Sequence, residues 1–173
     1  MTCILDSGIP LGCSSTGGIK RVLIANYDPA SVFGENATVP VEGQIDVISS
    51  TQTWYEYYFR PQTSVYGEEG THSTENGTFF YSQNVTMTFH KLEVAKRNAI
   101  LLLAMADLHI IVQTQNGDYW LVGEKNGANT TASLSSAGQA FGDLNGYTIT
   151  LTGSEPELAR AVTSAAIITL DIQ

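Results

Sequence analysis

The sequence predicts a mainly β protein with one α-helix, an antiparallel β-sandwich or half-barrel of about seven or eight strands. A flanking helix is expected at about 92–107 and a long β-hairpin arm at about 54–90. Two observations predict this class. Several short segments alternate polar and apolar residues with the period of two that a half-buried strand requires, and one segment of helix formers interrupts them. With 173 residues and 43% hydrophobic residues, the chain is long enough for the core of one domain, residues 1–173.

The N-terminal part divides into an arm and the first strands. Residues 1–18 are rich in Gly and Ser and show no period, so we expect an N-terminal arm or loop. Residues 19–27 (IKRVLIANY) carry branched residues at their centre and predict a strand. A second strand is expected within 39–48, where Pro40 and Gly43 interrupt the pattern.

Two aromatic segments alternate most clearly and predict the hairpin arm. The segment Trp54–Arg60 and the segment Tyr81–His90 are expected to pair, with the polar, glycine-containing segment 61–77 as the protruding tip. One face of this hairpin is apolar and is expected to pack inward. Its residues are Tyr55, Tyr57, Phe59, Val85, Met87 and Phe89.

The predicted helix, 92–107 (LEVAKRNAILLLAMAD), has Glu93 in its first turn and no internal Gly or Pro. Its C-terminal half is apolar almost all round, which predicts burial on several sides. After it, Asn116-Gly117 lies between two apolar runs, 108–114 and 119–123, and predicts a β-hairpin.

The C-terminal part predicts one loop and two strands. Residues 128–140 are Ser, Thr, Ala and Gly with a single Leu, which predicts a flexible loop that orders on contact with a neighbour. The segments 147–152 (YTITLT) and 165–172 (AAIITLDI) predict the last two strands.

Composition argues against nucleic-acid recognition and against a membrane role. Eight Lys and Arg against seventeen Asp and Glu give a net charge of −9, whereas phosphate binding depends on basic side chains. The longest apolar stretch, 99–106, is far shorter than a membrane span, and no export signal is visible. The two cysteines, Cys3 and Cys13, are expected to be free thiols in a reducing compartment.

No pattern of residues predicts an enzyme, a cofactor or a metal site. The segment 12–20 has Gly18 where a phosphate-binding loop needs Lys, and the residues after it predict a strand. His72, His90 and His109 lack metal-ligand spacing. Four Asn-x-Thr sites would favour a secreted adhesive β-domain if an export signal preceded them.

The order of these elements resembles the tail tube proteins (major tail proteins) of tailed bacteriophages, over about 17–157. Three pieces carry the resemblance, namely the helix that begins KLEVAKRN, the hairpin NGDYWLVG and the segment FGDLNGYTITLTG. The resemblance implies a structural virion protein whose subunits close into rings, usually hexamers, that stack into a tube. It also implies contacts with other tail or neck proteins, and a location in the virion tail after assembly in the host cytoplasm.

The implied tube is an acidic or neutral conduit through which double-stranded DNA passes at ejection without sequence-specific binding. We expect Glu56, Asn84, Thr86 and Thr88 to face the lumen, or alternatively to meet ordinary solvent. Glu68, Glu69 and Glu75 are expected on the arm, in contact with a neighbouring subunit or ring. Another ring-forming virion protein, such as a connector or tail terminator, and an adhesive β-sandwich module remain the alternatives.

Overall fold

The computed structural model describes residues 8–9, 12, 14–36 and 41–173. It is mainly β, with a large sheet and few helices, which confirms the predicted fold class. Within the described residues the elements are, in chain order, β1 (Ile19–Asn26), β2 (Val32–Gly34), β3 (Gln44–Ile45), β4 (Val47–Ser49), β5 (Tyr55–Tyr58), β6 (Val65–Ser73), β7 (Thr78–His90), α1 (Val94–Met105), β8 (Leu108–Thr114), β9 (Tyr119–Val122), β10 (Ala128–Ser136), β11 (Gly146–Glu155), β12 (Arg160–Val162) and α2 (Ser164–Ile168).

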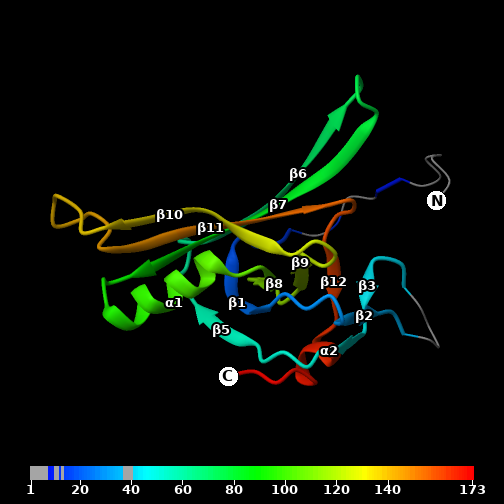
Figure 1. The fold of residues 1–173 in the computed structure, drawn as a ribbon, viewed down its shortest axis with the longest axis horizontal. Coiled ribbons are helices and arrows are strands. Elements are labelled where there is room, and N and C mark those ends of the chain that lie inside the picture. The colour runs from blue at the N-terminus through cyan, green and yellow to red at the C-terminus, as the bar shows by residue number, and fades with distance from the viewer. Residues whose placement is uncertain (1–7, 10–11, 13, 37–40) are drawn as a thin grey trace.

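The strands form layers that lie one above another in Figure 1. The first layer is the antiparallel sheet β10-β11-β7-β6. The second layer is β5-β1-β8-β9-β12-β3, joined to the first where Ala128 of β10 pairs with Leu108 of β8. The small sheet β2-β4 and the helix α2 cover the far side of the second layer.

The main core lies between the first two layers, and α1 covers one side of it. A second core fills the space between the second layer, β4 and α2, around the fully buried Trp54. Strand β8 is therefore buried on both faces, which explains why its sequence (LHIIVQT) is almost continuously apolar instead of alternating. The residues of the main core are Ile19, Val22, Ile24, Val85, Met87, Leu103, Leu108, Ile110, Val112, Val122, Ala128, Ile149 and Leu151.

Helix α1 lies within the predicted range, but its predicted burial on several sides is wrong. Leu103 is only 6% exposed, whereas Leu102 and Met105 are 70% and 80% exposed. The helix packs with one stripe against β10 and the main core, and no described part of the chain covers its outer face. Its outward-facing apolar residues thus form part of the molecular surface.

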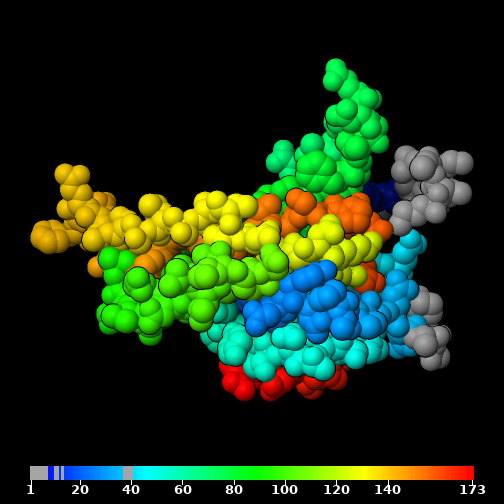
Figure 2. Space-filling view, viewed as in Figure 1, coloured from blue at the N-terminus to red at the C-terminus, as the bar shows by residue number. Residues whose placement is uncertain are grey.

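The arm exists, but its strands differ from the predicted pair. It consists of β6 and β7, with Val65 paired to Thr86 and Ser73 to Thr78, and it protrudes from the body (Figure 2). The segment Trp54–Arg60 does not pair with Tyr81–His90, because β5 pairs with β1 and thereby places Tyr57 against the main core. Of the six residues expected to pack inward, Tyr55 is exposed.

Two C-terminal predictions are also wrong. Most of the predicted loop 128–140 is a strand, since β10 (Ala128–Ser136) forms a long ladder with β11, and only residues 137–140 lie in the loop that follows. Residues 165–172 are not a strand, because α2 begins after Thr163, whose hydroxyl accepts a 3.4 Å hydrogen bond from the Ala166 N–H. The hairpin at Asn116-Gly117 is confirmed as β8–β9, and Gly117 adopts the left-handed conformation (φ 96°) that this turn needs.

The remaining N-terminal predictions are met only in part. The strand expected within 39–48 corresponds to the short strands β3 and β4, and residues 39 and 40 lie outside the described residues. Most of the expected N-terminal arm, including Cys3 and Cys13, also lies outside them. The segment after Gly18 is strand β1, so a phosphate bound at 12–18 would meet no helix N-terminus.

Candidate assembly surface

The outer face of the first layer is a continuous surface of small polar side chains. Because directly opposite residues of a ladder point to the same side, the threonines of β11 share this face with Asn84, Thr86 and Thr88 of β7. The other face carries Val85, Met87, Ile149 and Leu151 into the core. The outer residues of β11 are Thr148, Thr150, Thr152 and Ser154.

Hydrogen bonds between side chains tie these strands together on the outer face. The Oγ1 atoms of Thr86 and Thr150 are 3.1 Å apart, and the Thr152 hydroxyl donates a 2.7 Å hydrogen bond to Oδ1 of Asn84. Thr131 of β10 lies 3.0 Å from Thr152, oxygen to oxygen. The polar face is therefore ordered across three strands.

The structure brings together three of the four residues expected to face a lumen. Asn84, Thr86 and Thr88 lie side by side on the polar face. Glu56 does not join them, because it lies on β5 opposite Leu23, on the side of the second layer that faces the second core. There it forms an ion pair with Arg21, whose guanidinium also donates a 2.6 Å hydrogen bond to Gln113.

The three acidic residues of the arm also differ in their surroundings. Glu68 points to the core side of the arm base and is bonded within its own chain. It accepts hydrogen bonds from the Ala159 N–H (2.8 Å), from Gln83 (3.5 Å) and from the Tyr66 hydroxyl. Glu69 and Glu75 are exposed, so these two are available for contacts with another molecule.

The first layer has two free edges. Strand β6 pairs with β7 alone, and β10 pairs with β11 and, through Ala128, with the end of β8. No other described strand pairs with the outer edge of either, so each presents a row of backbone groups ready to pair with another strand. Val65 and Leu134 mark these two edges on the polar face and are 60% and 62% exposed.

Exposed apolar side chains gather beside this sheet. A groove of about 590 Å³ runs between α1 and the strands β1 and β5, with Leu102, Met105 and Tyr55 on its walls. Phe141 is fully exposed on the loop 137–145 at the end of the β10–β11 hairpin, which projects from the body (Figure 2). Clustered exposed apolar groups of this kind mark interaction surfaces.

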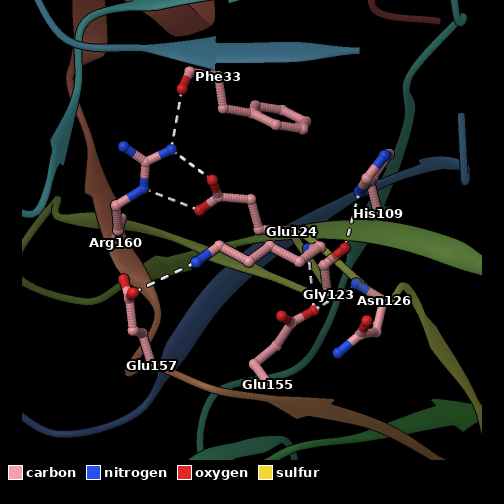
Figure 3. A network of polar contacts seen from close by, with 9 residues as sticks. Phe33, His109, Gly123, Glu124, Asn126, Glu155, Glu157 and Arg160 are labelled. Atoms are coloured by element: carbon pink, nitrogen blue, oxygen red, sulfur yellow. Dashed lines mark hydrogen bonds and ion pairs between the residues drawn. The ribbon is translucent and has the colours of Figure 1, made fainter. Parts of the chain in front are cut away.

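A polar network holds the two layers together where β9 leads into β10 (Figure 3). Arg160 of β12 forms an ion pair with Glu124 and donates a 2.8 Å hydrogen bond to the Phe33 carbonyl. Lys125 pairs with Glu157 at 3.2 Å. The network thereby links the second layer to β2 and to the segment after β11.

Glu155 stabilises the connection between β9 and β10 by hydrogen bonds to its backbone. Its carboxylate is 3% exposed and accepts hydrogen bonds from the N–H groups of Lys125 (3.0 Å) and Asn126 (2.9 Å). Burial raises the pKa of Glu155 above its ordinary value, although these two hydrogen bonds oppose the shift. The role of Glu155 was not predicted from the sequence, because a glutamate before a proline also marks an ordinary turn.

The described residues contain no group of His, Cys, Asp and Glu that could hold a metal ion, and His72, His90 and His109 lie on different strands. His109 is buried, with Nδ1 2.9 Å from the Gly123 carbonyl oxygen, and packs against Tyr27 and Phe33. None of the described helices is long and apolar enough to cross a bilayer.

Comparison of the chain with protein-family models, curated proteins and solved structures gives no match. The described residues present free strand edges and a neutral polar face on the first layer, with exposed apolar groups beside it. Exposed apolar groups are typical of interaction surfaces.

Proposed function

We propose that this chain is a structural virion protein that assembles into rings, stacked as the tube of a phage tail through which DNA passes. The observation that supports this best is the sheet β10-β11-β7-β6, which has a neutral polar face and two free edges. The resemblance to phage tail tube proteins further implies that the rings are hexameric and that they contact other tail or neck proteins.

The strand directions of this sheet allow a ring to close. In a ring with cyclic symmetry all subunits keep one orientation along the axis, so β10 of one copy would lie beside β6 of the next. Neighbouring strands are antiparallel across the sheet order β10, β11, β7 and β6, and β10 and β6 therefore run in opposite directions. Their junction would be antiparallel, like every other pair in the sheet.

The two edges are also offset along the sheet. Strand β6 pairs with residues 78–86 of β7, whereas β10 is level with residues 83–90 of β7 through its pairing with β11. A closed barrel requires such a stagger, because its strands tilt relative to the axis. Val65 and Leu134, both exposed on the polar face, would meet across the junction and bury apolar surface.

The charge of the sheet suits a conduit for DNA. The strands β6, β7, β10 and β11 contain no Lys or Arg. Their acidic residues are Glu68, Glu69 and Glu155, and two of these point to the core side. The polar face of these strands carries Thr, Ser and Asn, one carboxylate and no Lys or Arg, so DNA phosphates would slide past it.

Electron microscopy and size-exclusion chromatography of the purified protein test this proposal. We expect rings or hollow tubes for the wild type, and monomers for Leu134→Lys, because a lysine on an edge strand opposes pairing. Gln139→Lys, in the loop beyond β10, is the matched control and should assemble. Single rings that never stack would favour a connector or terminator, and a wild-type monomer at all concentrations would contradict the proposal.

A further inference from the structure

The two ends of the longest strand, β7, carry opposite charge. At the arm end, residues 61–90 include Glu68, Glu69 and Glu75 and no Lys or Arg. At the other end, three of the eight Lys and Arg residues of this acidic chain line one cleft. These three are Arg60, Lys91 and Lys96. Figure 1 places the arm tip and the start of α1 at opposite ends of the subunit.

The basic end forms a cleft of about 380 Å³. It lies between the end of β5, the end of β7 and the start of α1, and the aromatic rings of Tyr58, Phe59 and Phe89 form part of its wall. Its polar lining comes from Arg60, Thr88, His90, Lys91 and Lys96. A mixed wall of aromatic and cationic groups suits a partner that presents both aromatic and acidic side chains.

The positive charge of this cleft is not neutralised within the subunit. Lys91 and Lys96 share one carboxylate, that of Glu93, at 2.6 Å and 3.2 Å. Arg60 is exposed, and its guanidinium makes no hydrogen bond or ion pair within the part of the chain that the structure describes. Three cations thus face one carboxylate, and they would attract an acidic partner.

The tip of the arm has the chemistry that this cleft would bind. Glu69 and Glu75 are exposed, and Phe79 and Phe80 beside them are exposed aromatic groups. Phe79 packs edge-on against Tyr81, with 4.8 Å between ring centroids, and also lies against His72. The tip is therefore an ordered acidic and aromatic projection.

We propose that this cleft receives the arm tip of a second copy of the chain, in the adjacent ring, and that the contact stacks the rings. The inference rests on the proposed function and names the two surfaces that join one ring to the next. The cleft and the arm lie at opposite ends of β7, so the contact joins two unlike surfaces. Each ring can therefore bind a further ring at either end, and the rings add up to an open-ended tube. Binding of DNA phosphates by the cleft is the competing possibility, and the test below separates the two.

Charge reversal on each surface tests the contact. We expect two charge reversals, Glu69→Lys with Glu75→Lys on the arm and separately Arg60→Glu with Lys91→Glu in the cleft, to leave rings intact. Each should raise the concentration needed for stacking at least about tenfold. Combining all four substitutions in one chain should restore stacking, because opposite charges then face each other again. Glu42→Lys changes the charge at an exposed residue away from both surfaces and should stack as the wild type does.

The outcomes separate this contact from the ring itself. Wild-type protein that forms no ring contradicts the proposed function, whereas rings of either reversal variant that stack like the wild type contradict only the arm contact. Failure of the four-fold variant to restore stacking, or wild-type rings that never stack, would also overturn it. It would also be overturned if Arg60→Glu with Lys91→Glu lowered the retention of DNA on the rings while stacking stayed unchanged. Electron microscopy and sedimentation velocity at low and high salt provide these measurements.

Discussion

The hydroxyl of Thr152 donates a 2.7 Å hydrogen bond to the side-chain oxygen of Asn84, across the central pair of strands in the first layer. The bond lies on the outer, polar face of the sheet and is repeated on either side by threonine pairs. This row of side-chain hydrogen bonds fixes polar side chains that could otherwise rotate freely, and so maintains a smooth neutral surface.

Replacing Thr152 by valine removes this hydrogen bond and the 3.0 Å hydrogen bond with the Thr131 hydroxyl, with little change in side-chain size. We expect Thr152→Val to lower the free energy of unfolding by about 1–2 kcal/mol, because each such bond usually contributes about 1 kcal/mol. Thr148→Val is the control, because Thr148 is half-buried on the same strand and face. Urea denaturation of both variants measures the difference. Equal stabilities of the two variants would show that the side-chain hydrogen bonds of Thr152 contribute nothing to stability.

The close approach of β11 to the end of β7 depends on Gly146. A Cβ atom at this position would lie 2.0 Å from the Phe89 carbonyl oxygen, so the backbone must move to accept one. We expect Gly146→Ala to destabilise the fold by about 2 kcal/mol or more, as overpacking does. Gly142→Ala has open space around its Cβ and should change the melting temperature little. A Gly146→Ala variant as stable as Gly142→Ala would contradict the observed pairing of Gly146 with His90.

The buried carboxyl group of Glu155 should make stability depend on pH. Its pKa is raised by burial in the folded state, so folding favours the protonated form, and the stabilisation is present at low pH and lost as pH rises through the folded-state pKa. We expect the wild type to gain stability relative to Glu155→Gln as pH falls from 7 towards the ordinary carboxyl pKa.

The same comparison removes the effect of other titrating groups. Burial lowers the pKa of His109, which has the opposite consequence, because its protonation below the ordinary histidine pKa favours the unfolded state. Both proteins contain His109, so the difference between their chemical-denaturation curves isolates Glu155. A difference that does not vary with pH would show that the folded-state pKa of Glu155 is unshifted.

The exposed face of α1 should matter for association and not for folding. Leu102→Lys with Met105→Lys replaces exposed side chains, so we expect an unchanged melting temperature and weaker ring formation in size-exclusion chromatography. Leu103→Ala truncates the buried residue of the same helix and should cost about 2–5 kcal/mol of stability. Rings that form normally with both lysines present would exclude this face from the subunit interface.

Local signals explain which elements could be predicted from the sequence. The Asn116-Gly117 turn and the helix formers of α1 act over a few residues, and both elements are where they were expected. Alternation along β7 likewise predicted that Asn84, Thr86 and Thr88 share one face. These features depend on neighbouring residues and not on distant partners.

Elements that depend on distant partners were predicted less well. Strand β5 pairs with β1, more than thirty residues away, and this pairing moves Glu56 away from the polar face of the first layer. Strand β10 was missed because its Ser, Thr and Ala residues resemble a loop until β11 supplies a partner. Helix α2 was missed because its branched residues favour a strand, whereas the Thr163 cap and burial of Ile167 against the second core favour the helix.

A three-dimensional reconstruction of the assembled protein by cryo-electron microscopy is the decisive test of the proposed tube. We expect a closed ring in which β10 of each subunit pairs with β6 of the next, with Asn84, Thr86 and Thr88 lining the lumen. A protein that stays monomeric at every concentration, or a ring with these three residues on its outer surface, would contradict it.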